Sequence, residues 1–125
     1  MSLRTDALFR NDTADLSDQA KGILDQLGQE IRGLGSPAAG PVTITGHTDS
    51  EGSDSDNLDL SKERAEAVRE ELENRLGATY QYEAEGKGEA ELVAKEGGAD
   101  DTQARSRNRR VEVAYKLRAQ TPGAT

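Results

Sequence analysis

Apolar residues recur at spacings of three and four in two stretches of the chain, the period that places side chains on one face of a helix. The first stretch begins beside Ser17, a suitable N-cap residue, and ends near Gly33 or Gly35. The second ends before Gly77, a typical residue after a helix C-terminus. Both stretches therefore predict amphipathic helices, whose buried stripes are Leu16, Ala20, Ile23, Leu24, Leu27, Ile31 and Leu34, and Leu60, Ala65, Val68, Leu72 and Leu76.

Alternation of apolar and polar residues, the pattern of a strand with one buried face, occurs in residues 42–45, 80–85 and 111–117. A weaker apolar stretch, residues 4–9, predicts a further strand near the N-terminus. Residues 89–95 predict a short helix, residues 96–102 a polar loop, and residues 120–125 a disordered tail.

The predicted order of elements is β-α-β-α-β-(α)-β. Strands that are joined through helices imply right-handed crossovers, with the helices packed on a sheet. Because each strand alternates, one face of the sheet is expected to be polar and open to solvent. The sequence thus predicts an α/β fold, a two-layer sandwich with helices on one face of a mixed sheet, in a single domain of residues 1–119 followed by the tail 120–125.

Composition excludes several classes of protein. The 125 residues contain no cysteine, so disulfides, thiol catalysis and cysteine-bound metals are excluded. The formal net charge of −8 argues against nucleic acid and against an anionic membrane surface as partners. No apolar run approaches the ~18 residues needed to cross a bilayer, and no signal segment is visible, so we expect any signal or anchor of the natural protein to lie outside this chain.

Polar residues cluster where the second predicted strand leads into the second predicted helix. A strand-end loop that runs into a helix N-terminus favours an anionic group, because backbone N–H groups and the helix dipole face it. Asp49 could accept hydrogen bonds from an ammonium group, and Arg64 could grip a carboxylate with its two-pronged guanidinium. The pair would suit a zwitterionic ligand. The alternative from spacing alone is that the two form a structural ion pair or cap the helix.

Four ordered blocks of sequence resemble the OmpA-like peptidoglycan-binding domain, and the resemblance covers nearly the whole chain. The blocks are residues 44–53 (ITGHTDSEGS), 57–68 (NLDLSKERAEAV), 86–89 (GKGE) and 105–112 (RSRNRRVE). The resemblance implies a non-catalytic domain, without a cofactor, that binds bacterial peptidoglycan through the diaminopimelate of its stem peptide. It also implies a place in the extracytoplasmic cell envelope, facing the wall, and a possible homo-oligomer. The alternative is a protein–protein interaction domain of the envelope that does not bind the wall.

The resemblance also implies the residues of the binding pocket. The family's key aspartate and arginine fall on Asp49 and Arg64, and the other expected pocket residues are Thr48, Asn57, Arg109 and Asp12, with Asn11 beside it. The chain departs from the family pattern in Phe-Arg-Asn-Asp at residues 9–12, where the third residue is usually apolar, and in Leu92, where proline is expected. These departures concern the N-terminal wall of the pocket.

Other chemistry is less well supported. His47 is the single histidine, and a hydrogen-bonding or packing role is favoured over catalysis or metal binding. The acidic loop of residues 49–56 does not fit the spacing of an EF-hand calcium site. Glu83 and Glu85 alternate on one exposed strand face, which does not suit a glycosidase pair. The basic run of residues 105–110 lacks interleaved aromatic residues, so one arginine is assigned to the pocket and the others to neutralising nearby acids.

Overall fold

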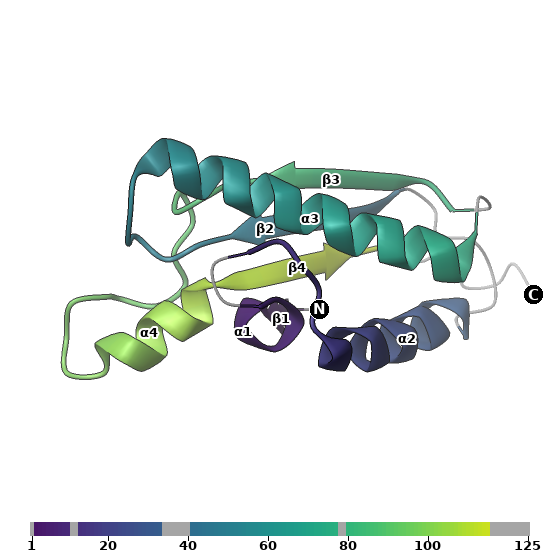
Figure 1. Ribbon diagram of the computed structural model, residues 1–125, viewed down its shortest axis with the longest axis horizontal. Helices are drawn as coiled ribbons and strands as arrows, with labels where there is room; N and C mark the ends of the chain where they lie inside the picture. Colours follow the sequence, from purple (N-terminus) through teal and green to yellow (C-terminus); the bar gives the residue numbers. More distant parts are fainter. Residues whose placement is uncertain (1, 11–12, 34–40, 78–79, 116–125) are drawn as a thin grey trace, which may run out of the picture.

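The structure, a computed structural model, describes residues 2–10, 13–33, 41–77 and 80–115 (Figure 1). In chain order the elements are β1 (Ser2–Arg4), α1 (Thr5–Leu8), α2 (Asp18–Arg32), β2 (Val42–His47), α3 (Asp54–Leu76), β3 (Tyr82–Gly86), α4 (Asp101–Asn108) and β4 (Arg110–Ala114). None of the helices in these four segments combines the length and the apolar character needed to cross a membrane.

The strands form one mixed sheet in the order β1-β4-β2-β3. Strands β2 and β3 are parallel and are joined through α3, whereas β4 is antiparallel to both β1 and β2. The two long helices, α2 and α3, lie side by side on one face of the sheet (Figure 1). The predicted two-layer α/β fold is therefore confirmed.

The two long helices follow the predicted apolar stripes. The Ser17 side chain caps α2 by accepting a hydrogen bond from the Ala20 N–H at 3.1 Å, as predicted. Ser53 caps α3 in the same way, so this helix begins at Asp54, within the segment predicted to be a loop. The helix ends at Gly77, whose φ of 82° is a conformation that favours glycine.

The predicted strand at residues 4–9 is wrong. Strand β1 ends at Arg4, and the chain turns through one helical turn, α1, in which Thr5 and Leu8 are buried together. Burial three residues apart is the spacing of a helix and not of a strand. The Thr5 N–H donates to the carbonyl oxygen of Arg109 at 2.9 Å, which fixes the point where the chain leaves the sheet.

The segment between β3 and β4 also differs from the prediction. Residues 89–95 form turns and bends instead of a helix, and the predicted polar loop gives way to α4 from Asp101 onward. The Asn108 side chain accepts hydrogen bonds from the N–H groups of Val93 and Ala94 at 2.8 and 2.9 Å and donates to the Ala94 carbonyl at 2.9 Å. These bonds replace the backbone bonds that a helix would have made.

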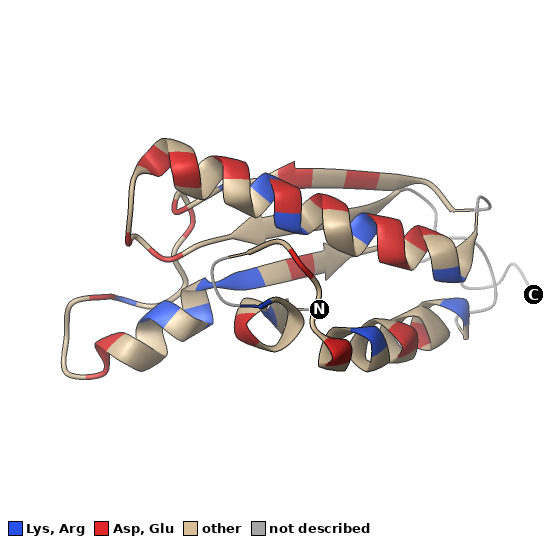
Figure 2. Cartoon of the chain, in the orientation of Figure 1, with Lys and Arg blue, Asp and Glu red and all other residues tan. Residues whose placement is uncertain are grey.

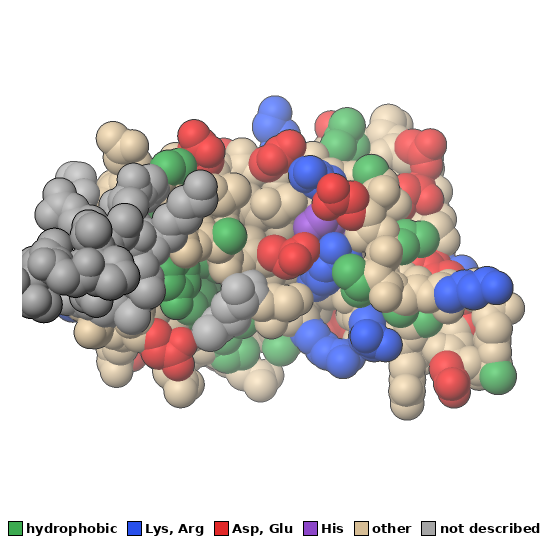
Figure 3. Space-filling view, turned by 180° about the vertical axis from the view of Figure 1, so that it is seen from behind, with side chains coloured by type: hydrophobic (Ala, Val, Ile, Leu, Met, Phe, Trp, Pro, Cys, Tyr) green, Lys and Arg blue, Asp and Glu red, His purple; other side chains and the backbone are tan. Residues whose placement is uncertain are grey.

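The face of the sheet opposite the long helices is polar, as predicted (Figure 3). Glu83 and Glu85 of β3 are exposed on it, and acidic residues also follow the outer side of α3 (Figure 2).

His47 is 2% exposed, with its Nε2 atom 2.9 Å from the carboxylate of Glu112. Burial and the neighbouring guanidinium of Arg110 lower the pKa of His47, which favours the neutral imidazole. The structure thus places this histidine in a buried position beside Glu112, in agreement with the predicted hydrogen-bonding or packing role.

Helix α3 approaches the sheet most closely at two glycines. A Cβ atom on Gly46 of β2 would overlap the carbonyl oxygen of Ser61, and one on Gly86 of β3 would overlap the backbone nitrogen of Lys62. Both obstacles are helix backbone, which cannot move aside like a flexible side chain. The two glycines therefore set how near α3 lies to the ends of β2 and β3.

We expect Gly46→Ala to lower the free energy of unfolding by about 1–3 kcal/mol, the usual cost of overpacking a tight contact. Urea unfolding of the purified variant measures this change. Gly22→Ala is the matched control, because a Cβ atom at Gly22 meets nothing within 4 Å. That change should leave stability equal or raise it by about 0.5–1 kcal/mol, since alanine is the better helix former. Equal stability of Gly46→Ala and wild type would contradict the close packing.

Candidate functional site

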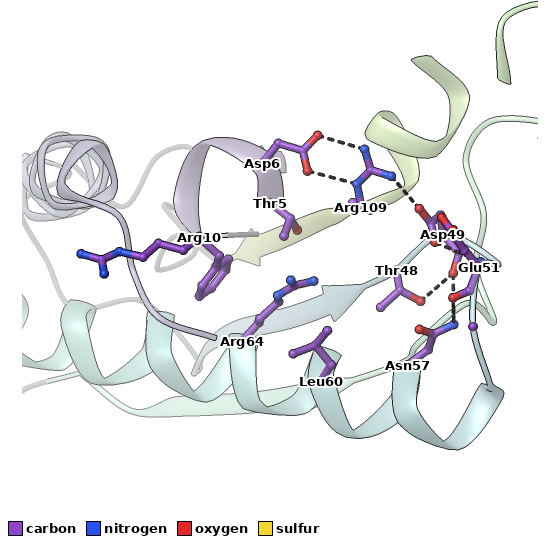
Figure 4. A pocket seen from close by; sticks show the side chains of 12 residues that line it. Thr5, Asp6, Arg10, Thr48, Asp49, Glu51, Asn57, Leu60, Arg64 and Arg109 are labelled. Atoms are coloured by element: carbon purple, nitrogen blue, oxygen red, sulfur yellow. Dashed lines mark hydrogen bonds and ion pairs between the residues drawn. The ribbon is translucent and has the colours of Figure 1, made fainter. Parts of the chain in front are cut away.

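A cavity of about 540 Å³ opens at the end of the sheet where β2 leads into α3 (Figure 4). Helix α1 forms one side of the cavity and the first half of α3 forms the other. The loop after β2 and Arg109, the residue before β4, complete its lining. The described residues that line it are Thr5, Asp6, Phe9, Arg10, Thr48, Asp49, Glu51, Gly52, Asn57, Leu60, Arg64 and Arg109.

Asp49 follows β2 and has a side chain only 8% exposed. Its Oδ2 atom accepts a hydrogen bond from Nη1 of Arg109 at 2.6 Å, and its Oδ1 atom accepts from the backbone N–H of Glu51 at 3.0 Å. Each carboxylate oxygen has two acceptor positions, so these bonds leave acceptor capacity on both oxygens. The carboxylate is thus fixed in place and can still receive an ammonium group.

Arg109 joins two acidic residues. Its Nε and Nη2 atoms donate to the two oxygens of Asp6 at 3.0 and 3.1 Å, while Nη1 is directed at Asp49. The hydrogen bond from Arg109 lowers the pKa of Asp6 against the opposing effect of burial, and the bonds to Asp6 and Asp49 raise the pKa of Arg109. Asp6 and Arg109 are therefore both charged at neutral pH.

Arg64 approaches the same cavity from the other side, on α3 (Figure 4). It is 6% exposed, its Nε atom donates to the carbonyl oxygen of Thr13 at 2.8 Å, and its guanidinium carbon lies 5.4 Å from the centre of the Phe9 ring. A cation over an aromatic face is favourable, and a buried guanidinium binds a carboxylate strongly. Asp49 is paired with Arg109, which differs from the alternative in which Asp49 and Arg64 form a structural ion pair.

Thr48 and Asn57 hold the loop that carries Asp49. The Thr48 hydroxyl donates to the Asp49 carbonyl at 2.8 Å, and the Asn57 side chain donates to the Glu51 carbonyl at 2.9 Å from the first turns of α3. Both side chains line the cavity, and both are buried. They shape the loop by satisfying its backbone carbonyl groups.

Charges of both signs meet in this cavity. The described lining residues include three carboxylates (Asp6, Asp49, Glu51) and three guanidinium groups (Arg10, Arg64, Arg109), whose formal charges cancel. Figure 4 shows Asp6, Arg109 and Asp49 in a row along one side, Arg64 reaching toward them, and Arg10 pointing away. Such a lining suits a ligand with a positive and a negative group close together.

Five of the six residues predicted for the pocket, Thr48, Asp49, Asn57, Arg64 and Arg109, line this one cavity. The sixth, Asp12, and its neighbour Asn11 lie outside the described residues. The sequence reasoning missed Asp6, because it assigned residues 4–9 to a strand. Two further arginines of the basic run pair with acids, Arg105 with Asp101 and Arg110 with Glu112.

Within the described segments, no group of three or more histidine, aspartate or glutamate side chains is arranged to hold a metal ion.

The sequence resembles known proteins over most of its length. The sequence model of the OmpA family matches residues 8–109. The chain is 32% identical over 123 residues to outer membrane protein A of Serratia marcescens, which covers 92% of this chain and 34% of that protein. It is 38% identical over 112 residues to a photosystem I chlorophyll a apoprotein of Gloeobacter violaceus, covering 87% of this chain and 12% of that protein. The chain thus spans about a third of the length of the first relative and about an eighth of the second.

Two solved structures resemble this chain over more than nine-tenths of its length. The cell wall anchor of the T6SS from Pseudomonas aeruginosa superimposes with a TM-score of 0.79 and 30% identity, covering 94% of this chain and 80% of that one. The peptidoglycan-associated lipoprotein of Burkholderia pseudomallei gives a TM-score of 0.71 and 29% identity, covering 92% of this chain and 89% of that one.

We expect Arg109→Ala to raise the pKa of Asp6 toward its ordinary value, because the hydrogen bond that lowers it is removed. Carboxyl titration by NMR measures this shift, and Arg107→Ala, an equal change of charge on the exposed side of α4, is the control. In wild type the ionised Asp6 stabilises the fold above about pH 4, and this stabilisation is lost as the pH falls through the lower folded-state pKa. Unfolding of Arg109→Ala should therefore depend less on pH in this acidic range. An unchanged Asp6 titration in the variant would contradict the assignment.

Proposed function

The chain belongs to the OmpA family, and we propose that it is a non-catalytic module that holds bacterial peptidoglycan by binding the diaminopimelate of the stem peptide. The observation that carries the proposal is the cavity in which Asp49 and Arg64 face each other across a lining with charges of both signs. The binding involves no chemical step.

Two similar structures support wall binding as the general role. One is described as a cell wall anchor and the other as a peptidoglycan-associated lipoprotein, and both cover more than nine-tenths of this chain. The curated relative from Serratia marcescens is an outer membrane protein. These similarities support our proposal that the chain acts in the cell envelope, outside the cytoplasm and facing the wall.

The charges of the cavity support diaminopimelate as the recognised group. Its side chain ends in a carbon that carries both an ammonium and a carboxylate. In our proposal Asp49, fixed by Arg109, accepts hydrogen bonds from the ammonium, while Arg64 donates to the carboxylate. Each charge-assisted hydrogen bond of this kind contributes about 1.5–3 kcal/mol.

The same arrangement predicts discrimination against walls built with lysine. A lysine side chain at this position of the stem peptide supplies the ammonium and lacks the second carboxylate. Its binding would lack the charge-assisted hydrogen bonds that the Arg64 guanidinium donates to that carboxylate in our proposal. The difference in affinity between the two peptides would come from these bonds.

We expect Arg64→Ala to weaken binding of a diaminopimelate-containing stem peptide about tenfold to a hundredfold, the loss of one charge-assisted interaction. Calorimetric titration measures the dissociation constant, with a lysine-containing peptide alongside. Arg69→Ala is the matched control, because Arg69 lies on the same helix and pairs with Glu66 and Glu73, away from the cavity. Thermal melting of each variant shows that the protein titrated is folded.

The titration also defines what would contradict the proposal. Equal binding of the two peptides by wild type would remove the assignment of Arg64 to the second carboxylate. An equal loss in Arg64→Ala and Arg69→Ala would show that charge alone, and not this cavity, attracts the peptide.

A second measurement concerns the intact wall. We expect the protein to sediment with insoluble sacculi that contain diaminopimelate and Asp49→Asn to remain largely in the supernatant. Retention of wild type in the supernatant would favour a protein–protein interaction domain instead.

A further inference from the structure

Glu96 is a buried acid that does not line the cavity. It lies in the segment between β3 and α4, and its side chain is 7% exposed. Three donors form hydrogen bonds to its carboxylate: the Ser50 hydroxyl at 2.6 Å, the Ser50 N–H at 3.2 Å and the Asn108 side-chain amide at 2.6 Å. Nη1 of Arg105 lies 3.0 Å away as an ion-pair partner. A side chain with two acceptor oxygens and a negative charge therefore suits this position.

The partners of Glu96 belong to the two segments that carry the ion pair of the cavity. Ser50 directly follows Asp49, and Asn108, the last residue of α4, directly precedes Arg109. One carboxylate therefore ties the loop of Asp49 to the end of α4, which Arg109 directly follows. The loop is held from its other side by Asn57, through the Glu51 carbonyl.

The ionisation of Glu96 is consistent with this role. Burial by itself would raise the pKa of Glu96, but the hydrogen bonds from Ser50 and Asn108 outweigh burial and hold the pKa below its usual value. The guanidinium of Arg105 acts in the same direction. The carboxylate is thus charged at neutral pH and can accept the bonds from Ser50 and Asn108.

We propose that Glu96 is a positioning residue of the binding site, which sets the relative placement of Asp49 and Arg109 without contacting the ligand. This inference rests on the proposed binding of diaminopimelate at Asp49 and Arg64. A carboxylate that lies 2.6 Å from its guanidinium partner is sensitive to small shifts of either segment, so a loose loop weakens binding.

Glu96→Gln tests the proposal. The glutamine has nearly the same shape, but its NH₂ group would face donors, and only one acceptor oxygen remains. We expect at least a tenfold loss of affinity for the diaminopimelate-containing peptide, a smaller preference over the lysine-containing peptide, and faster hydrogen exchange of the Ser50 amide. Glu96→Asp, which keeps both acceptor oxygens, should recover part of the affinity, a rescue that a purely steric role would not give.

Two further variants complete the experiment. Glu91→Gln is the control, with the same change of charge in the same segment, on a side chain that is 54% exposed and pairs with Lys87. Ser50→Ala removes the hydrogen bond from the Ser50 hydroxyl and keeps the carboxylate, so a loss of twofold to fivefold is expected even if Glu96→Gln does not fold.

Each result decides the matter. The role of Glu96 would be overturned, and the proposed function left intact, if folded Glu96→Gln bound with wild-type affinity or if Glu91→Gln lost as much affinity. If Glu96→Gln does not fold, wild-type affinity in Ser50→Ala would overturn the role in the same way. Absence of peptide binding by wild type would overturn the proposed function, and the role of Glu96 with it.

Discussion

The close contact of α3 with the sheet at Gly46 and Gly86 is the constraint on which the site depends. The Ser61 hydroxyl sits at this contact, where it accepts a hydrogen bond from the Gly88 N–H at 3.0 Å and donates to the Leu58 carbonyl at 2.8 Å. Arg64 lies one helical turn further along α3. The separation of helix and sheet therefore determines how far the Arg64 guanidinium lies from Asp49, which follows the strand.

The site is organised before any ligand enters it. Arg109 is held by two carboxylates, and Asp49 receives both a guanidinium and a backbone N–H group. A buried charge is costly without a partner, and here the partners come from the chain itself. Little reorganisation is then needed on binding, which preserves more of the interaction energy as affinity.

Much of the fold could be predicted from the sequence, because α2, α3, β2, β3 and β4 bury one regular stripe each. The turn at residues 89–95 and the short helix α4 depend on contacts with residues far away in the sequence, which leave no periodic pattern in the segment itself. The turn at residues 89–95 exists because the Asn108 side chain satisfies its backbone, and α4 has few apolar residues to mark it. In the site, the polar cluster before the second predicted helix already indicated Asp49 and Arg64, and the family resemblance added Arg109. Asp6 acquires its place only through Arg109, 103 residues later.

The two edge strands of the sheet, β1 and β3, have features that disfavour pairing with strands of other molecules. Strand β1 has only three residues, and β3, at the other edge, exposes Glu83 and Glu85. A strand from another molecule that paired with β3 would have to approach these two carboxylates, and a second copy of β3 would bring like charges close together. Many copies held near one another on a surface would therefore resist joining their sheets into larger aggregates.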